Sequence, residues 1–149
     1  MKTLKLICFV VVAGVAFTAC SKEKRLEKRL TKKEGVWNIT SLEYKYFADG
    51  ALYEDRTFSN VGSFEFEETS GTMRLDSALF GDSAMSIPFT WDNTEDMVTV
   101  YTADFDTLAF TVETDEKKEQ VWFRAQEFYN ATADEDIREE FRYTLIRED

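Results

Sequence analysis

The chain of 149 residues contains no histidine, only two cysteines and a single proline. Without histidine there is no imidazole for acid–base catalysis, for a Ser-His-Asp triad or for a His-ligated metal site. Cys8 lies in an apolar stretch near the N-terminus, so the rest of the chain holds only Cys20 and no internal disulfide is expected there. A glycine-rich phosphate loop is also missing. We therefore expect no enzymatic activity, no catalytic residue, no cofactor and no metal site.

Positive charge is scarce beyond residue 34. Residues 35–149 hold nine Lys or Arg against 26 Asp or Glu, a net charge of −17. A body of this charge repels the phosphate backbone, so no nucleic-acid partner is expected. With so many carboxylates, two that lie close together carry no information about catalysis. The same surplus favours a basic partner if the body binds another protein.

The first nineteen residues have the pattern of a signal peptide. Lys2 and Lys5 form a basic start, and residues 6–17 are uncharged. Twelve residues are too few to cross a bilayer as a helix, which takes about 20. They suit the apolar region of a signal peptide, which is followed by small residues at the cleavage site. We predict that residues 1–19 are removed.

The stretch AGVAFTACSKEK, residues 13–24, ends this apolar run in Cys20. It resembles the lipobox of bacterial lipoproteins, in which the cysteine is lipidated and becomes the first mature residue. The resemblance implies an acyl anchor at Cys20, and two or three acyl chains hold a protein firmly on a membrane. Ser21 follows Cys20, which under the sorting rule of enteric bacteria implies the outer membrane of the cell envelope. The alternative is an ordinary secretory signal.

Residues 20–34 are predicted to be the lipidated cysteine followed by a basic tether. Residues 21–34 carry seven Lys or Arg and three Glu, and Leu26 and Leu30 are spaced four apart. A helix of about 14 residues is marginal by itself in water. Two readings stay open: a basic collar on anionic head groups, where each basic residue contributes about 1 kcal/mol, or a solvated spacer.

Residues 35–149 are predicted to form one domain, in which apolar and polar residues alternate with the period of a β-strand. Short polar turns such as Asp92-Asn-Thr-Glu95 separate the runs, so neighbouring strands are expected to pair antiparallel. The pattern predicts an all-β fold, a single up-and-down barrel of about eight strands. One short helix is considered over Ala133 to Glu140, capped by Thr132 or Asp134.

A Gly-x-Trp sequence, Gly35-Val36-Trp37, opens the first expected strand. The segments FEFEETSGTMRL (residues 64–75) and IPFTWDNTEDMVTVY (residues 87–101) follow it. Together they resemble the lipocalin-like, or calycin-like, lipoproteins of Bacteroidetes. The resemblance implies a barrel in which Trp37 packs across the closed end.

Alternation places a set of rings on the inward face of the expected barrel, and these are the predicted ligand-binding residues: Trp37, Phe64, Phe66, Phe89, Trp91, Phe110, Phe123 and Tyr143. Tyr143, with Arg124 or Arg142 near the mouth, would add polar groups. Trp122 has the opposite parity to Phe123 and is predicted outside. The leading function is binding of a small apolar ligand, with membrane attachment through Cys20. The alternative is a protein-interaction or inhibitor module that docks a basic partner on its acidic outer surface.

Overall fold

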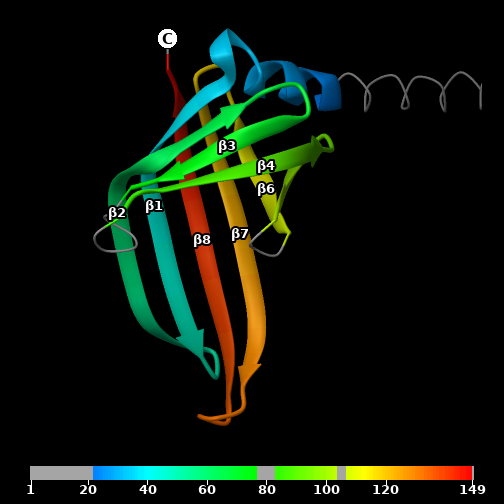
Figure 1. The fold of residues 1–149 in the computed structure, drawn as a ribbon. Helices are drawn as coiled ribbons and strands as arrows, with labels where there is room; N and C mark the ends of the chain where they lie inside the picture. Colours follow the sequence, from blue (N-terminus) through cyan, green and yellow to red (C-terminus); the bar gives the residue numbers. More distant parts are fainter. Residues whose placement is uncertain (1–21, 77–82, 104–106, 149) are drawn as a thin grey trace, which may run out of the picture.

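The computed structural model describes residues 22–76, 83–103 and 107–148 (Figure 1). Its strands are β1 (Val36–Ala48), β2 (Ala51–Phe66), β3 (Ser70–Leu75), β4 (Met85–Asn93), β5 (Met97–Thr102), β6 (Leu108–Asp115), β7 (Glu119–Asn130) and β8 (Glu135–Arg147). A helix over residues 22–30 and a 3-10 turn, η1 (Lys33–Gly35), precede them. The predicted signal peptide and Cys20 lie outside the described residues.

The eight strands form one closed barrel in which each strand pairs antiparallel with its neighbours in the chain, and β8 pairs back to β1. The predicted all-β, up-and-down architecture is confirmed. Period-two alternation sends every second side chain into the barrel, and closure leaves no unpaired edge around its circumference. The fold is consistent with a lipocalin-like barrel.

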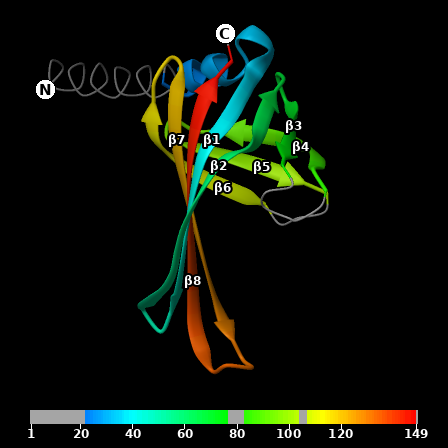
Figure 2. The same ribbon diagram turned by 90° about the vertical axis from the view of Figure 1, so that its left-hand side faces the viewer.

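The strands differ in length, and this gives the molecule an elongated shape (Figure 2). β3 and β5 have six residues each, whereas β1, β2, β7 and β8 have 12 to 16. Among described residues, β2 pairs with β3 only from Gly62 onward, and β7 pairs with β6 only up to Phe123. Residues 43–60 and 124–142 therefore continue beyond the barrel as a four-stranded sheet, which we name the extension.

The segment expected to be a tether is partly built into the fold. Leu26 and Leu30 of the helix are buried in the barrel core. Arg29 forms an ion pair with Asp115 at 2.6 Å, and Asn93 donates a hydrogen bond to the Glu23 carbonyl at 3.1 Å. This packing stabilises a helix that would be marginal in isolation. A solvated spacer is thus the wrong description of residues 22–30, which cover one end of the barrel.

The helix considered over Ala133 to Glu140 is not formed. Residues 131–134 are a turn, and Glu135–Arg147 is strand β8. The physical reason is pairing: Glu135 to Glu140 lie opposite Ala125 to Asn130 of β7, and Ile137 is buried on the inner face of the extension. Tertiary pairing thus overrides a weak local preference for helix. Within the described residues, no helix is long and apolar enough to cross a bilayer.

Candidate functional site

The helix-covered end of the barrel is filled by aromatic rings. Phe64 lies at the centre, with ring centroids 5.5 to 6.2 Å from those of Phe66, Phe89, Phe110 and Trp122. Such stacked, tilted and edge-to-face contacts between rings are favourable beyond the area they bury. The three indole N–H groups are all paired: Trp37 with the Leu30 carbonyl, Trp91 with the Glu67 carbonyl and Trp122 with the Gln120 side chain. This half of the barrel is a packed core.

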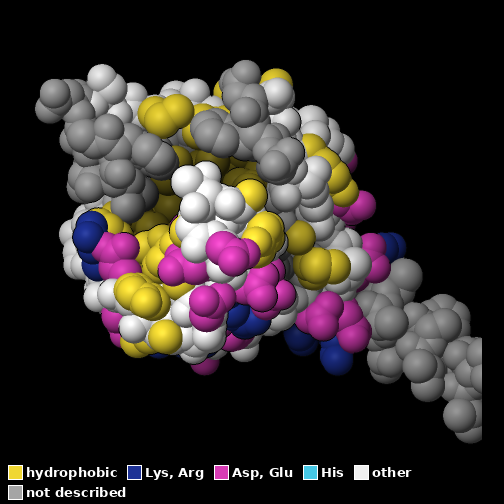
Figure 3. All heavy atoms as spheres, turned by 90° about the horizontal axis from the view of Figure 1, so that it is seen from below, with side chains coloured by type: hydrophobic (Ala, Val, Ile, Leu, Met, Phe, Trp, Pro, Cys, Tyr) yellow, Lys and Arg dark blue, Asp and Glu magenta, His cyan; other side chains and the backbone are white. Residues whose placement is uncertain are grey.

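The other half of the barrel holds a cavity of about 380 Å³, at the level where the extension begins. Seen from the far end of the extension, it is a recess lined by hydrophobic side chains (Figure 3). Twelve residues line it: Leu42, Tyr44, Phe58, Met73, Leu75, Ile87, Leu108, Phe110, Arg124, Glu139, Phe141 and Tyr143. The volume falls in the range of small-molecule sites, and the lining is mostly apolar with a few polar groups, as such sites are.

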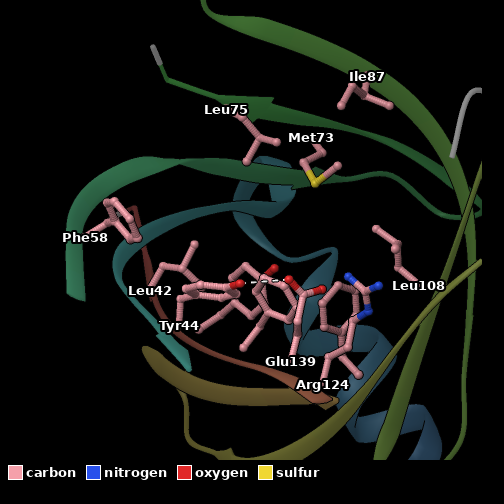
Figure 4. Close-up of a pocket in the computed structure, with 12 residues that line it drawn as sticks. Leu42, Tyr44, Phe58, Met73, Leu75, Ile87, Leu108, Arg124 and Glu139 are labelled. Atoms are coloured by element: carbon pink, nitrogen blue, oxygen red, sulfur yellow. Dashed lines mark hydrogen bonds between the residues drawn. The ribbon is translucent and has the colours of Figure 1, made fainter. Parts of the chain in front are cut away.

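The polar groups of the cavity lie together on one wall, which β1, β7 and β8 supply (Figure 4). Tyr44 donates a hydrogen bond to Glu139 at 2.7 Å, Gln126 donates to the other oxygen of the same carboxylate, and Arg124 donates to Gln126. Met73, Leu75 and Ile87 face this wall from the opposite side. The cavity is therefore amphipathic, with a hydrogen-bonded wall and an apolar wall.

Arg124 is the cation of this wall. Its guanidinium lies over the Phe141 ring, 5.3 Å from the centroid, and no carboxylate of the described residues forms an ion pair with it. A guanidinium has five N–H donors, and Arg124 uses two of them, one in the hydrogen bond to Gln126 and one in a hydrogen bond to the Tyr143 hydroxyl. Arg124 thus retains donors for an acceptor group inside the cavity.

Tyr143 and Tyr44 are both held in their neutral form. Burial raises the pKa of Tyr143 to about 12, although the nearby Arg124 acts in the opposite direction. Burial, followed by the hydrogen bond to Glu139, raises the pKa of Tyr44. Both phenols are therefore neutral at neutral pH.

The raised pKa of Tyr143 predicts a loss of stability in alkaline solution. Because the unfolded phenol loses its proton near pH 10 and the folded one near pH 12, this stabilisation is complete below pH 10 and is lost as pH rises to 12. Tyr143→Phe is expected to remove up to about 3 kcal/mol of that pH dependence. Urea unfolding between pH 9 and 12 measures it. Tyr101→Phe on the surface of β5 is the control, and equal pH dependence in both variants would contradict the assignment.

Most of the predicted inward-facing residues do point into the barrel. Trp37, Phe64, Phe66, Phe89, Trp91 and Phe110 are buried, and Tyr143 packs partly buried against the same core. Only Phe110 and Tyr143 of that set line the cavity. The others are buried at the packed end of the barrel. Among the predicted polar groups, Tyr143 and Arg124 line the cavity.

The prediction of which side chain points into the barrel is wrong for Trp122 and Phe123, two neighbouring residues of β7. Trp122 is fully buried inside the barrel, whereas Phe123 lies outside, with the Arg142 guanidinium 5.7 Å from its ring centroid. Residues 121–123 are all apolar, so alternation did not define the inner face there. Gln120 lies on the same inner face and accepts a hydrogen bond from the Trp122 N–H. Because Gln120 is polar, it also breaks the apolar pattern expected of an inward-facing position. Phe123 is therefore withdrawn from the cavity.

Arg142 also lies outside the cavity. It binds Glu113 through two hydrogen bonds of 3.0 and 3.1 Å, which raise its pKa. Arg124, two strand positions from Trp122, shares the inner face. The two arginines thus differ in environment while both lie on the last two strands, which makes them a matched pair for mutagenesis.

Several lining residues were not predicted, because they lie where the sequence pattern is weakest. Leu42 and Tyr44 follow an irregularity in the β1–β2 register after Ile39, and this irregularity shifts the alternation. Glu139 is charged, and its inward position follows from its pairing with Tyr46 and Gln126. Phe58 was the one detectable signal, an aromatic residue in an otherwise polar stretch.

Comparison with protein-family models, curated proteins and solved structures gives no significant match for this chain. The site is therefore interpreted from its own geometry. In the part of the chain that the structure describes, no three Cys, Asp or Glu side chains converge to hold a metal ion.

Proposed function

We propose that the protein is a membrane-anchored lipoprotein of the cell envelope whose barrel binds one small, largely apolar ligand, and that it is not an enzyme. The observation that carries the binding proposal is the cavity of about 380 Å³ with Arg124 on its wall. At about 30 Å³ per water molecule, this is the space of about a dozen waters. It suits a ligand of comparable size, such as a medium-chain acyl compound.

The chemistry of the wall supports a ligand with an apolar body and a hydrogen-bond acceptor at one end. Leu42, Leu75 and Ile87 offer apolar surface to the body, and each buried methylene contributes about 0.8 kcal/mol. Arg124 offers charge-assisted donors to the acceptor end. Glu139 is an acceptor whose two oxygens already receive hydrogen bonds from Tyr44 and Gln126. Arg124 is therefore the group on this wall that can bind the carboxylate of a ligand.

A fluorescence titration with decanoic acid and decan-1-ol tests the proposal. Trp122 packs against Phe110 of the cavity lining at a centroid distance of 5.4 Å, so a bound ligand is expected to change tryptophan emission. Because hydrogen bonds to charged groups contribute about 1.5–3 kcal/mol, Arg124→Met should weaken the acid by about tenfold or more and leave the alcohol nearly unchanged. Arg142→Met, on the outer face, should bind both probes like the wild type.

A second variant addresses the apolar part of the cavity. Leu108 lines it and is only partly buried, so Leu108→Trp is expected to fill space without displacing the packed core. Both probes should then bind more weakly while the melting temperature in the absence of probe stays close to wild type. Equal binding by wild type and Leu108→Trp would place the probes elsewhere and contradict the cavity as the site.

The proposed anchor has its own test. Cys20→Ala removes the thiol that would carry the acyl chain, so incorporation of labelled palmitate into the protein should fall to background. Ser21→Ala is the control and should be labelled like the wild type. Equal labelling of the Cys20→Ala variant would refute the lipoprotein assignment.

A further inference from the structure

The far end of the extension exposes large apolar side chains that the proposed ligand site does not use. Leu52 and Tyr53 on β2 are 52% and 69% exposed, and Phe128 and Tyr129 on β7 are 48% and 58% exposed. We name residues 48–55 and 127–136 the tip. Phe128 and Tyr129 line one groove together, and large apolar groups exposed in one patch mark interaction sites more often than isolated ones do. Tyrosine in particular is enriched where proteins bind one another.

The tip is held in place by contacts between its two turns. The Asp49 N–H donates to the Asp136 carbonyl at 2.9 Å, and the Asp136 N–H donates to the Asp49 side chain at 3.0 Å. Beside these bonds lies a groove of about 520 Å³, whose lining includes Phe128, Ile137 and Arg138, the last in an ion pair with Glu127 at 2.6 Å. A partner would therefore meet a preorganised surface, which lowers the entropy cost of binding.

The charge of the tip selects among partners. Its residues include seven Asp or Glu and no Lys or Arg, and two of these carboxylates, Glu54 and Glu127, pair with arginines that lie just outside the tip. In Figure 3, which looks onto this end, acidic side chains gather beside hydrophobic ones. Nucleic acid and anionic lipid are repelled by such a surface, and a second copy docking tip to tip would bring like charges together. A cationic protein segment is attracted.

The position of the tip is also suited to a partner. The helix over residues 22–30 and the tip lie at opposite ends of the molecule (Figure 1). If the chain is anchored at Cys20, two residues before this helix, the tip is directed away from the membrane. This step depends on the proposed anchor, whereas the exposure and charge of the tip do not.

We propose that the tip is a docking surface for a basic protein segment that carries Leu or aromatic side chains between its Lys and Arg residues. The apolar side chains of the segment cover Phe128 and Tyr129, and its basic side chains pair with carboxylates such as Asp55 and Glu135. Binding is expected to be independent of the barrel cavity, because the groove at the tip and the cavity have no lining residue in common.

Selection of a random twelve-residue peptide library, displayed on phage, against the full-chain protein tests the proposal. Enriched peptides should combine Lys or Arg with Leu or aromatic residues. Their synthetic forms should bind at least tenfold more weakly to Phe128→Ser/Tyr129→Ser and to Asp55→Asn/Glu135→Gln. Affinity should also fall as salt is raised. Matched controls are Tyr101→Ser, an exposed tyrosine on β5, and Glu68→Gln/Glu116→Gln, which removes the same charge from turns outside the tip.

The remaining outcomes overturn the proposal. They are a selection without binders, enriched peptides that are not basic, and peptides that bind the tip variants and the controls alike. Self-association of the protein in sedimentation that Phe128→Ser/Tyr129→Ser abolishes would assign the surface to a second copy. Binding to phosphatidylcholine or phosphatidylglycerol vesicles that is lost in the same variant would assign it to lipid. Circular dichroism melts establish that each variant is folded.

Discussion

Replacing Trp37 by alanine is expected to lower the free energy of unfolding by about 3–5 kcal/mol, the cost of removing a large ring from a packed core. Trp37 is fully buried at the end of the barrel that the helix covers. Its N–H donates to the Leu30 carbonyl at 3.1 Å, and the Arg147 guanidinium lies 5.7 Å from its ring centroid. One side chain thus joins the helix, the first strand and the last strand.

The loss extends beyond the cavity that the ring leaves. Nε and Nη1 of the buried Arg147 have no hydrogen-bond partner in the described structure, so the Trp37 face is an important favourable contact of that cation. Urea unfolding followed by circular dichroism measures the effect. Tyr101→Ala, which removes an exposed ring, should cost less than about 1 kcal/mol. A Trp37→Ala midpoint equal to that of wild type would show that the ring does not close the barrel.

Gly35→Ala is expected to cost about 2–5 kcal/mol although it adds a single methyl group. Gly35 has φ +64°, and a Cβ built there would lie 2.0 Å from the carbonyl oxygen of Phe66 and 3.0 Å from that of Leu30. The left-handed conformation costs a non-glycine residue about 1–2 kcal/mol. Overpacking against backbone that cannot rotate away adds about 1–3 kcal/mol.

Gly50 provides the matched control for this prediction. Its φ is +77°, yet a Cβ there would meet nothing within 4 Å. Gly50→Ala should therefore show only the conformational term, about 1–2 kcal/mol. The difference between the two alanine variants in thermal or urea unfolding isolates the steric contribution at Gly35. Equal destabilisation of the two would mean that the chain end moves to accommodate the added methyl group.

Gly35 and Trp37 show why part of the fold could be predicted from the sequence. The Gly-x-Trp motif marks a close backbone approach at Gly35 and a buried ring at Trp37, and both are local requirements that leave a trace in residue type. Alternation over Phe64 and Phe66, with short turns between runs, then specifies antiparallel neighbours. A period of two and short connections are sufficient to predict an up-and-down barrel.

The cavity was less predictable, because it depends on which inward positions are filled by neighbouring rings. Phe64, Phe66 and Phe89 have the same inward parity as Phe110, but mutual packing converts them into core. Alternation of apolar and polar residues predicts whether a side chain points into the barrel. It does not predict where along the barrel axis that side chain lies. The inward Arg124 and Glu139 are charged, and charged residues are normally assigned to the outer face.

The extension was not expected at all. The strands β1, β2, β7 and β8 are long enough to leave the barrel, but nothing in the sequence distinguishes a long barrel strand from a strand that projects. The helix over residues 22–30 was recognised only as a marginal possibility. Its burial at Leu26 and Leu30 depends on the barrel end to which it binds.

Native mass spectrometry of the full-chain protein after incubation with decanoic acid tests most directly whether the barrel cavity binds a ligand. We expect a one-to-one complex in wild type and in Arg142→Met, and clearly lower occupancy in Leu108→Trp and Arg124→Met. No complex in wild type, or equal occupancy in all four proteins, would contradict a ligand site in the barrel cavity.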